Sequence, residues 1–335
     1  MATKINLFLP NPTPLCYSHK FVQKESRVTG MKAMKSEPLS RYLKPEEVKS
    51  LTQKNAWLGT WVVVKAWLSI AAIFTVVAIW TNPVTIVLAV ILLGGRQLNL
   101  AIIMHDAGHH LLYRERKMNT FVGNWFAAYF LFLNTEHYAK QHSHHHGLSG
   151  TERDPDLPNF KSYPVTKSSF LRKISRDIFG ITAIKFVIGL ALNKTGLMEK
   201  DASHYQTIMK GIIVNFAFVG VLWSMNLTWL YWLWVGAFFT SYMLVLRIRQ
   251  AAEHGSVPEP LNRDPRAHTR TTLANLFERM LFAPSKVNFH VEHHLVPNVP
   301  CYRLPALHTL LQQRGYFEAY PCTKGYGVLL NDLVA

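Results

Sequence analysis

The hydrophobic pattern of the chain is dominated by two long stretches without a charged residue. The first covers thirty positions, from Ala66 to Gly95, and the second covers thirty-six, from Gly211 to Leu246. A helix needs roughly 20 residues to cross a bilayer, so each stretch is too long for one crossing and suits two. The sequence therefore predicts two pairs of membrane-spanning helices.

Each stretch is interrupted near its middle. In the first, Thr81 and Asn82 precede Pro83, which removes a backbone donor and disfavours helix in the residue before it. In the second, Met225 and Asn226 form a weaker break. We expect spans near residues 57–80, 84–105, 208–225 and 227–246. The predicted fold is an all-α integral membrane protein with four transmembrane helices in two hairpins and a histidine-rich cap.

The remaining segments are assigned by length and polarity. Residues 121–133 and 179–192 are apolar but too short to span, so we expect them at the membrane interface. Residues 1–50 are predicted to form a flexible tail, with a cleaved organelle transit peptide as the alternative. Residues 51–315 would form the membrane domain and residues 316–335 a C-terminal tail.

The charge balance orients the predicted spans. Lys and Arg number 36 against 20 Asp and Glu, a formal charge of +16, although only 17% of residues are charged. Residues 1–54 carry ten Lys or Arg, whereas the turns around Asn82 and Asn226 carry none. By the positive-inside rule, both termini and both large polar segments are cytoplasmic. The basic charge then needs no nucleic-acid partner, and the length of the apolar stretches disfavours a soluble protein with two buried hairpins.

Twelve of the sixteen histidines gather in four short segments at the polar ends of the predicted spans. His105 and His109 are four residues apart, and His254 directly follows the fourth span. Two triads share the spacing i, i+3, i+4: His142, His145 and His146, and His290, His293 and His294. Because such positions share a helical face, His105 and His109 present two imidazoles to one point, and each triad places three rings on one face.

Nine converging imidazoles indicate two metal ions, because one ion takes about four to six ligands. Imidazole suits Fe, Zn, Cu or Ni, and the spacing does not choose among them. The repeated positions carry no carboxylate, unlike those of soluble di-iron bundles. The three cysteines are widely spaced and predict neither a disulfide framework nor a thiolate site: Cys16, Cys301 and Cys322.

Ligating histidines also need an acceptor for their second ring nitrogen. Six acids close to the histidine segments could supply it: Asp106, Glu136, Asp154, Asp156, Glu253 and Glu292. Gln250, one helical turn before His254, could face the same site and hold a bound water. His110, His137 and His144 fall off the shared faces, so we expect them behind the ligands or in solvent.

These motifs resemble the membrane fatty acid desaturase family, which includes hydroxylases and ketolases that act on lipids. The three boxes are HDAGH at 105–109, HSHHH at 142–146 and HVEHH at 290–294. GTERDPD at 150–156, HHLVP at 293–297 and YRLP at 302–305 are also similar to the family. The resemblance covers roughly residues 50–315.

The resemblance implies a four-span membrane domain with a cytoplasmic cap and a dinuclear iron centre held by nine histidines. It also implies O2-dependent oxidation of an unactivated C–H bond, with no catalytic side chain beyond the metal centre. His254 matches the family's extra ligand. Gln250 stands where some members have a water-binding Asn.

We expect an acyl-chain desaturase whose substrate is an acyl-lipid, acyl-CoA or acyl carrier protein. A hydroxylase or ketolase acting on a carotenoid or alkane is the alternative, because both reactions use the same kind of site. A metal transporter is disfavoured, since transporters place polar ligands near the bilayer midplane. The sequence contains no HPGG motif, ferredoxin-like cysteine run or GxGxxG motif. We therefore expect a separate electron donor, a ferredoxin or cytochrome b5, docking on the positive face through a small contact.

Overall fold

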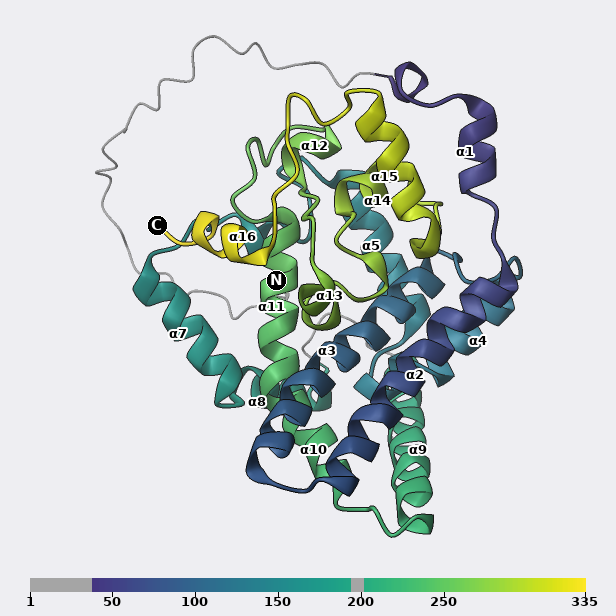
Figure 1. Ribbon diagram of the computed structural model, residues 1–335, viewed down its shortest axis with the longest axis vertical. Helices are drawn as coiled ribbons and strands as arrows, with labels where there is room; N and C mark the ends of the chain where they lie inside the picture. The colour runs from purple at the N-terminus through teal and green to yellow at the C-terminus, as the bar shows by residue number, and fades with distance from the viewer. Residues whose placement is uncertain (1–37, 194–201) are drawn as a thin grey trace.

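The computed structural model describes residues 38–193 and 202–335, and every extended element within these ranges is a helix (Figure 1). Two isolated β-bridges join Val165 to Val334 and Thr272 to Thr323. The all-α prediction is confirmed. Most of the predicted N-terminal tail, and with it the transit-peptide alternative and Cys16, lies outside the described residues.

Within the described residues, four helices are long and apolar enough to cross a membrane. They are α2 (Ala56–Ile79), α3 (Pro83–Gly108), α9 (Ala202–Ser224) and a continuous fourth helix made of α10 (Leu230–Ala237), the π-helical η3 (Phe238–Tyr242) and α11 (Met243–His254). Each overlaps a predicted span, although the fourth continues past residue 246 to His254. The sequence criterion stopped it at the first charge, Arg247, but this side chain is buried in an ion pair with Asp177.

The outer surface of these helices is apolar. Only 33% of the most apolar part of α2 and 28% of that of α9 are buried inside the protein. Leu68, Val76, Phe216 and Trp223 are among the large side chains left exposed. Contiguous apolar surface of this kind is typical of a face that contacts lipid rather than water. The chain is a multi-pass membrane protein.

Short turns connect the crossings in pairs. Asn82 caps α3 by accepting hydrogen bonds from the backbone N–H groups of Val84 at 3.0 Å and Thr85 at 3.1 Å, and Pro83 occupies the first helical position. Between α9 and α10, Asn226 adopts a left-handed conformation with φ of 57°. Both turns lie at the lower end of Figure 1. The opposite ends of the helices therefore point toward the polar half of the molecule.

Helix α3 is the central element of the bundle. It packs against α2, α10, η3 and α5, and it is largely buried from Leu93 to Ala107. A Cβ atom added at Gly94 would lie 2.4 Å from Oγ of Ser241, so only glycine permits this close approach to the fourth crossing. Gln97 Nε2 donates to the Trp234 carbonyl at 2.8 Å. These contacts fix the depth at which the last turns of α3 enter the cap.

The polar half is built from the shorter elements. Before the third crossing lie η1 (Leu39–Arg41), α1 (Pro45–Leu51), α4 (Arg116–Trp125), η2 (Ala128–Leu131), α5 (Thr135–Leu148), α6 (Leu157–Phe160), α7 (Lys167–Ile178) and α8 (Ile181–Ala191). After the fourth lie α12 (Pro265–His268), α13 (Leu276–Leu281), η4 (Pro284–Lys286), α14 (His290–Leu295), η5 (Cys301–Arg303), α15 (Leu304–Gln313) and α16 (Tyr326–Asp332).

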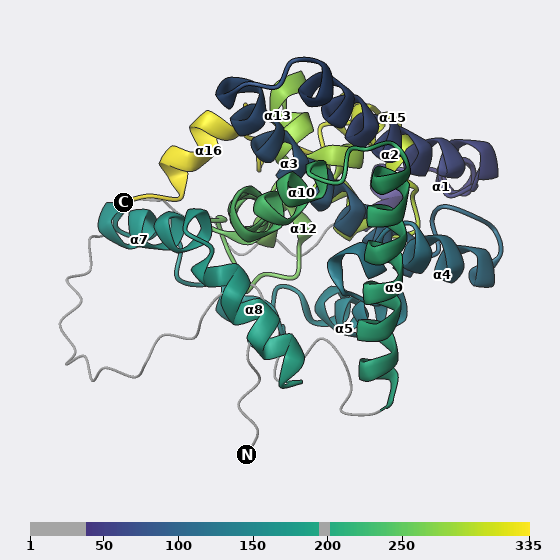
Figure 2. The ribbon, with the colours of Figure 1, turned by 90° about the horizontal axis from the view of Figure 1, so that it is seen from below.

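Two short apolar segments and the C-terminal residues also belong to this half. The apolar segments at 121–133 and 179–192 form α4 with η2, and α8, on opposite flanks of the bundle (Figure 2). Their location at the membrane interface stays a prediction. Residues 316–335, predicted as a C-terminal tail, pack against the body through Leu329 and Leu333, which are fully buried, and α16 contacts α11.

Candidate metal centre

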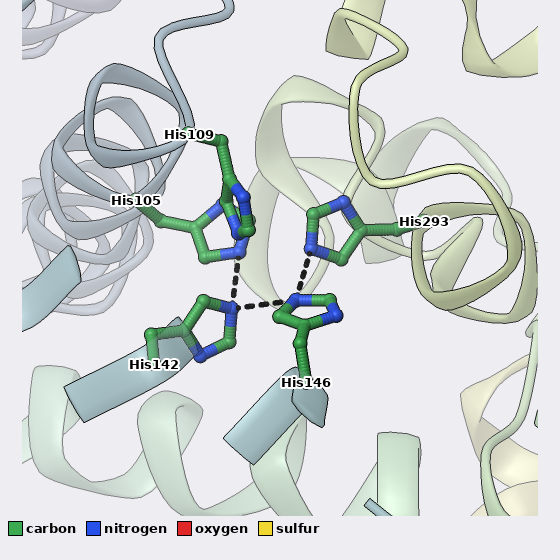
Figure 3. A group of neighbouring side chains, drawn as sticks. All are labelled: His105, His109, His142, His146 and His293. Atoms are coloured by element: carbon green, nitrogen blue, oxygen red, sulfur yellow. Dashed lines mark hydrogen bonds between the residues drawn. The ribbon is translucent and has the colours of Figure 1, made fainter. Parts of the chain in front are cut away.

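Five histidines form a first histidine group at the end of α3. They are His105, His109, His142, His146 and His293, and one ring nitrogen of each lies within 4.8 Å of those of the others (Figure 3). Nε2 of His142 lies 2.9 Å from Nε2 of His105 and 3.0 Å from Nε2 of His146, which in turn lies 3.0 Å from Nε2 of His293. Segments more than 180 residues apart in the chain thus meet at one point.

The other four predicted ligands form a second histidine group. It consists of His145, His254, His290 and His294. Nε2 of His290 lies 2.9 Å from Nε2 of His254 and 3.1 Å from Nε2 of His294. His145 joins this group with its ring centroid 4.8 Å from that of His254. The structure therefore brings together all nine histidines that the sequence singled out.

The two groups are neighbours, because α5 and α14 contribute to both. The ring centroids of His146, in the first group, and His294, in the second, are 4.3 Å apart. On each short helix the two histidines four residues apart enter one group, and the third histidine enters the other. Adjacent helical positions such as His145 and His146 differ by about 100° in direction, so the third ring of each triad reaches the other group.

Local structure fixes the position of α5. Asn134 precedes the helix and accepts hydrogen bonds from the backbone N–H groups of Glu136 at 2.9 Å and His137 at 3.0 Å. Such a cap defines the first turn, and with it the direction of every later side chain. The helix ends at Leu148, and Gly150 then adopts a φ of 73°, which turns the chain toward Asp154.

Hydrogen bonds to the second ring nitrogen orient three of the imidazoles. Nδ1 of His145 lies 2.8 Å from Asp154 Oδ1, and Nδ1 of His105 lies 2.9 Å from Asp106 Oδ1. Nδ1 of His254 donates to a backbone carbonyl, that of His268, at 3.2 Å. A proton on Nδ1 leaves Nε2 with a free lone pair, which is the form that binds metals.

The contacts among the Nε2 atoms cannot all be hydrogen bonds. A ring nitrogen offers either one proton or one lone pair. His142, His146 and His290 each have an Nε2 atom that faces two other Nε2 atoms at 2.9–3.1 Å. Nε2 of His109 is also buried and has no hydrogen-bond partner among the described residues. Several lone pairs therefore point into the same small volumes.

The spacing of these atoms fits shared metal ions. With a metal–nitrogen bond of about 2.1 Å, two ligands at a right angle are about 3.0 Å apart. The observed separations of 2.9–3.1 Å have this value. The all-imidazole donor set also suits iron as well as other first-row transition metals.

Burial disfavours the charged form of most ligand imidazoles outside the membrane helices. Burial, followed by the charge of neighbouring histidines, lowers the pKa of His109 to about 4 and that of His146 to about 2. The same causes hold the pKa values of His142, His290, His293 and His294 well below the usual value. His145 differs: burial lowers its pKa, but Asp154 and Asp156 outweigh burial and raise it.

The remaining predicted residues take different places. Gln250 Oε1 is buried and has no hydrogen-bond partner in the described ranges. Asp156 Oδ2 lies 3.7 Å from Nδ1 of His145. Glu292 does not support a ligand imidazole: it accepts from Thr271 Oγ1 at 2.5 Å and pairs with His308, which ties α14 to α15.

Other histidines near the boxes lie apart from the two groups. His110, His137 and His144 belong to neither group, as expected, and His144 and Glu136 are exposed. The supporting roles of His268 and His308 were missed by the sequence reasoning. Neither lies at helical spacing from another histidine, so no local signal marks them.

Comparisons with known proteins agree with this geometry. The model of the fatty acid desaturase family matches residues 80–326, a range that includes all nine histidines. The chain is 28% identical over 250 residues to the dihydrorhizobitoxine desaturase of Bradyrhizobium elkanii. That alignment covers 71% of this chain and 70% of the relative.

Proposed function

Because the chain belongs to the fatty acid desaturase family, we propose that it is an O2-dependent di-iron enzyme that introduces a C=C double bond into a lipid acyl chain. The enzyme is an oxidoreductase of the desaturase type. In the balanced reaction, a –CH2–CH2– unit loses two hydrogen atoms and O2 is reduced to two water molecules. Two electrons and two protons come from outside the substrate.

The convergence of nine imidazoles on two adjacent points, six of them buried and three partly buried, carries this proposal. The first iron ion would be held by the five histidines of the first group and the second by the four of the second group. Bound iron supplies the O2 chemistry that removes hydrogen from an aliphatic carbon, which side-chain acids and bases cannot do. Asp106 and Asp154 keep their histidines oriented, and Gln250 would hold a water at the site.

The membrane helices suit a substrate that arrives from the lipid. Both ligand-bearing crossings, α3 and α11, reach the site directly from the apolar part of the molecule. An acyl chain partitions into that apolar region and can approach the groups without entering water. We place the site and both termini on the cytoplasmic side, as the distribution of Lys and Arg indicates.

Electrons would come from a separate ferredoxin or cytochrome b5. An excess of 16 positive charges outside the uncharged stretches favours docking of an acidic partner. We expect no product when the purified chain receives only substrate, O2 and NAD(P)H, and product formation when a donor and its reductase are added. Product formed without the donor would contradict this part of the proposal.

The function is tested by expression in a host of known lipid composition, followed by mass spectrometry of its fatty acids. Loss of two hydrogens supports desaturation, whereas gain of oxygen would identify a hydroxylase or ketolase. His293→Ala and His145→Ala, one from each group, should abolish the product and reduce bound iron while leaving membrane insertion intact. His144→Ala is the matched control, because His144 is exposed on the same helix as His145. Wild-type iron content in both group variants would refute the assignment.

A further inference from the structure

The two histidine groups are unequal in number, five against four, and a buried carboxylate lies beside the smaller one. Glu253 precedes His254 on α11 and is 5% exposed. Its Oε2 atom lies 3.5 Å from Nε2 of His290. One carboxylate oxygen of Glu253 and one ring nitrogen each of His254 and His290 all lie within 4.8 Å of one another.

The side from which Glu253 approaches distinguishes it from the other acids of the site. Asp154 and Asp106 contact Nδ1, the nitrogen that points away from the metal position. Glu253 instead contacts Nε2 of His290, the nitrogen that faces His254 and His294. A carboxylate behind a ligand orients its ring, whereas one on the Nε2 side shares the volume into which the lone pairs point.

We infer that Glu253 supplies a carboxylate oxygen as the fifth protein ligand of the second metal ion. This inference rests on the proposed di-iron function. With Glu253, the second group offers five donors, as many as the first group. Only one of the two ions then has an oxygen donor from the protein, so the two ions are chemically different.

Charge balance supports the same conclusion. Neutral imidazoles bring no charge to offset two ferrous ions, and Arg249, 8% exposed, adds a further cation nearby. Glu253 Oε1 lies 2.6 Å from Arg249 Nε, which leaves Oε2 directed at the second group. Buried cations require a paired anion, so a carboxylate placed between Arg249 and the metal position serves both.

The principal alternative is that Glu253 only neutralises Arg249. Three variants separate the two roles: Glu253→Gln, Glu253→Gln combined with Arg249→Gln, and Glu292→Gln as a control. Glu292 is fully buried on α14 but pairs with Thr271 and His308. Each purified chain is loaded with 57Fe and challenged with a chelator, and its iron content and Mössbauer spectrum are measured.

We expect wild type and Glu292→Gln to retain two iron ions per chain with two distinct Mössbauer doublets. Glu253→Gln should retain one ion at wild-type affinity and hold the other at least tenfold more weakly, with only one doublet altered. The double variant should behave like Glu253→Gln, because removing Arg249 does not replace the lost oxygen.

Two outcomes would overturn the inference. Restoration of both ions and both doublets in the double variant would show that Glu253 acts only through Arg249. Unchanged iron content and doublets in folded Glu253→Gln would exclude it as a ligand; if that variant does not fold, the double variant decides in the same way. Failure of the wild-type chain to bind two ions would instead refute the proposed di-iron function.

Discussion

Replacing Asp154 by Asn measures how far the second histidine group depends on a carboxylate behind one of its rings. Asp154 Oδ1 lies 2.8 Å from Nδ1 of His145, and the Asp154 side chain is 2% exposed. The amide of Asn keeps a hydrogen-bond acceptor but removes the negative charge that makes the imidazole a better donor to the metal. Partners of this kind contribute roughly 10–100-fold to metal affinity, which is about 1.4–2.7 kcal/mol.

Asp156→Asn is the matched control for this substitution. Its Oδ2 atom lies 3.7 Å from the same nitrogen, too far for a hydrogen bond, and its side chain is 45% exposed, so it orients the ring less than Asp154 does. We expect this variant to change iron affinity by less than about threefold.

The assay is competition of each purified variant with a chelator of known iron affinity, with circular dichroism as the check on folding. Asp154→Asn should weaken only the ion held by the second histidine group, to which His145 belongs. The reasoning fails if folded Asp154→Asn binds both ions as tightly as wild type, or if Asp156→Asn weakens binding equally.

Three other predictions concern stability, measured by thermal unfolding in detergent. Asp177→Asn leaves Arg247 buried without its partner and should cost about 3–5 kcal/mol, whereas Asp177→Leu with Arg247→Met should be nearly neutral; equal losses would contradict this. Gly94→Ala places a Cβ atom 2.4 Å from Ser241 Oγ and should cost about 1–3 kcal/mol of folding free energy. Gly220→Ala is its control and should cost less, because a Cβ atom at Gly220 meets no described atom within 4 Å. With free iron at 100 times its Kd, each bound ion should stabilise the folded chain by about 2.7 kcal/mol, so a chelator should lower the free energy of unfolding by that amount per site. An unchanged melting temperature would refute metal binding.

The sequence predicted the parts of the structure that depend on local interactions. Uncharged stretches longer than a soluble core helix indicated four crossings, and residues 38–193 and 202–335 contain four long apolar helices. Where the prediction stopped early, at Arg247, the cause was a long-range contact: Asp177 on α7 neutralises this charge and lets the helix continue to His254. The sequence of residues 240–254 does not predict that Asp177 is the partner of Arg247.

The sequence predicted which histidines come together, but not how they divide into two groups. Helical spacing identified eight of the nine histidines, because residues three or four positions apart share a face whatever the tertiary structure, and His254 was identified by its place directly after the fourth span. Their division into two groups depends on where α5 and α14 lie relative to α3 and α11, which spacing does not specify. The carbonyl of His268 behind His254 and the position of Glu253 beside His290 likewise arise only when distant segments pack together.

The direction of the helices contributes to metal binding beyond the ligands themselves. Three helices present their carboxyl ends to the two groups: α3 through His105 and His109, α5 through His145 and His146, and α11 through His254. The unpaired carbonyls of a helix end favour a nearby cation by about 0.3–1 kcal/mol, so three ends favour bound metal by roughly 1–3 kcal/mol. The described segment before α2, with η1 and α1, lies at the same end of the bundle as the polar half, and the chain comes back to that end with the last turns of α3 and of α11 (Figure 1). The order of the helices therefore places the carboxyl ends of α3 and α11 at the histidine groups. This is why the ligands on the long apolar helices belong to the second and fourth of them.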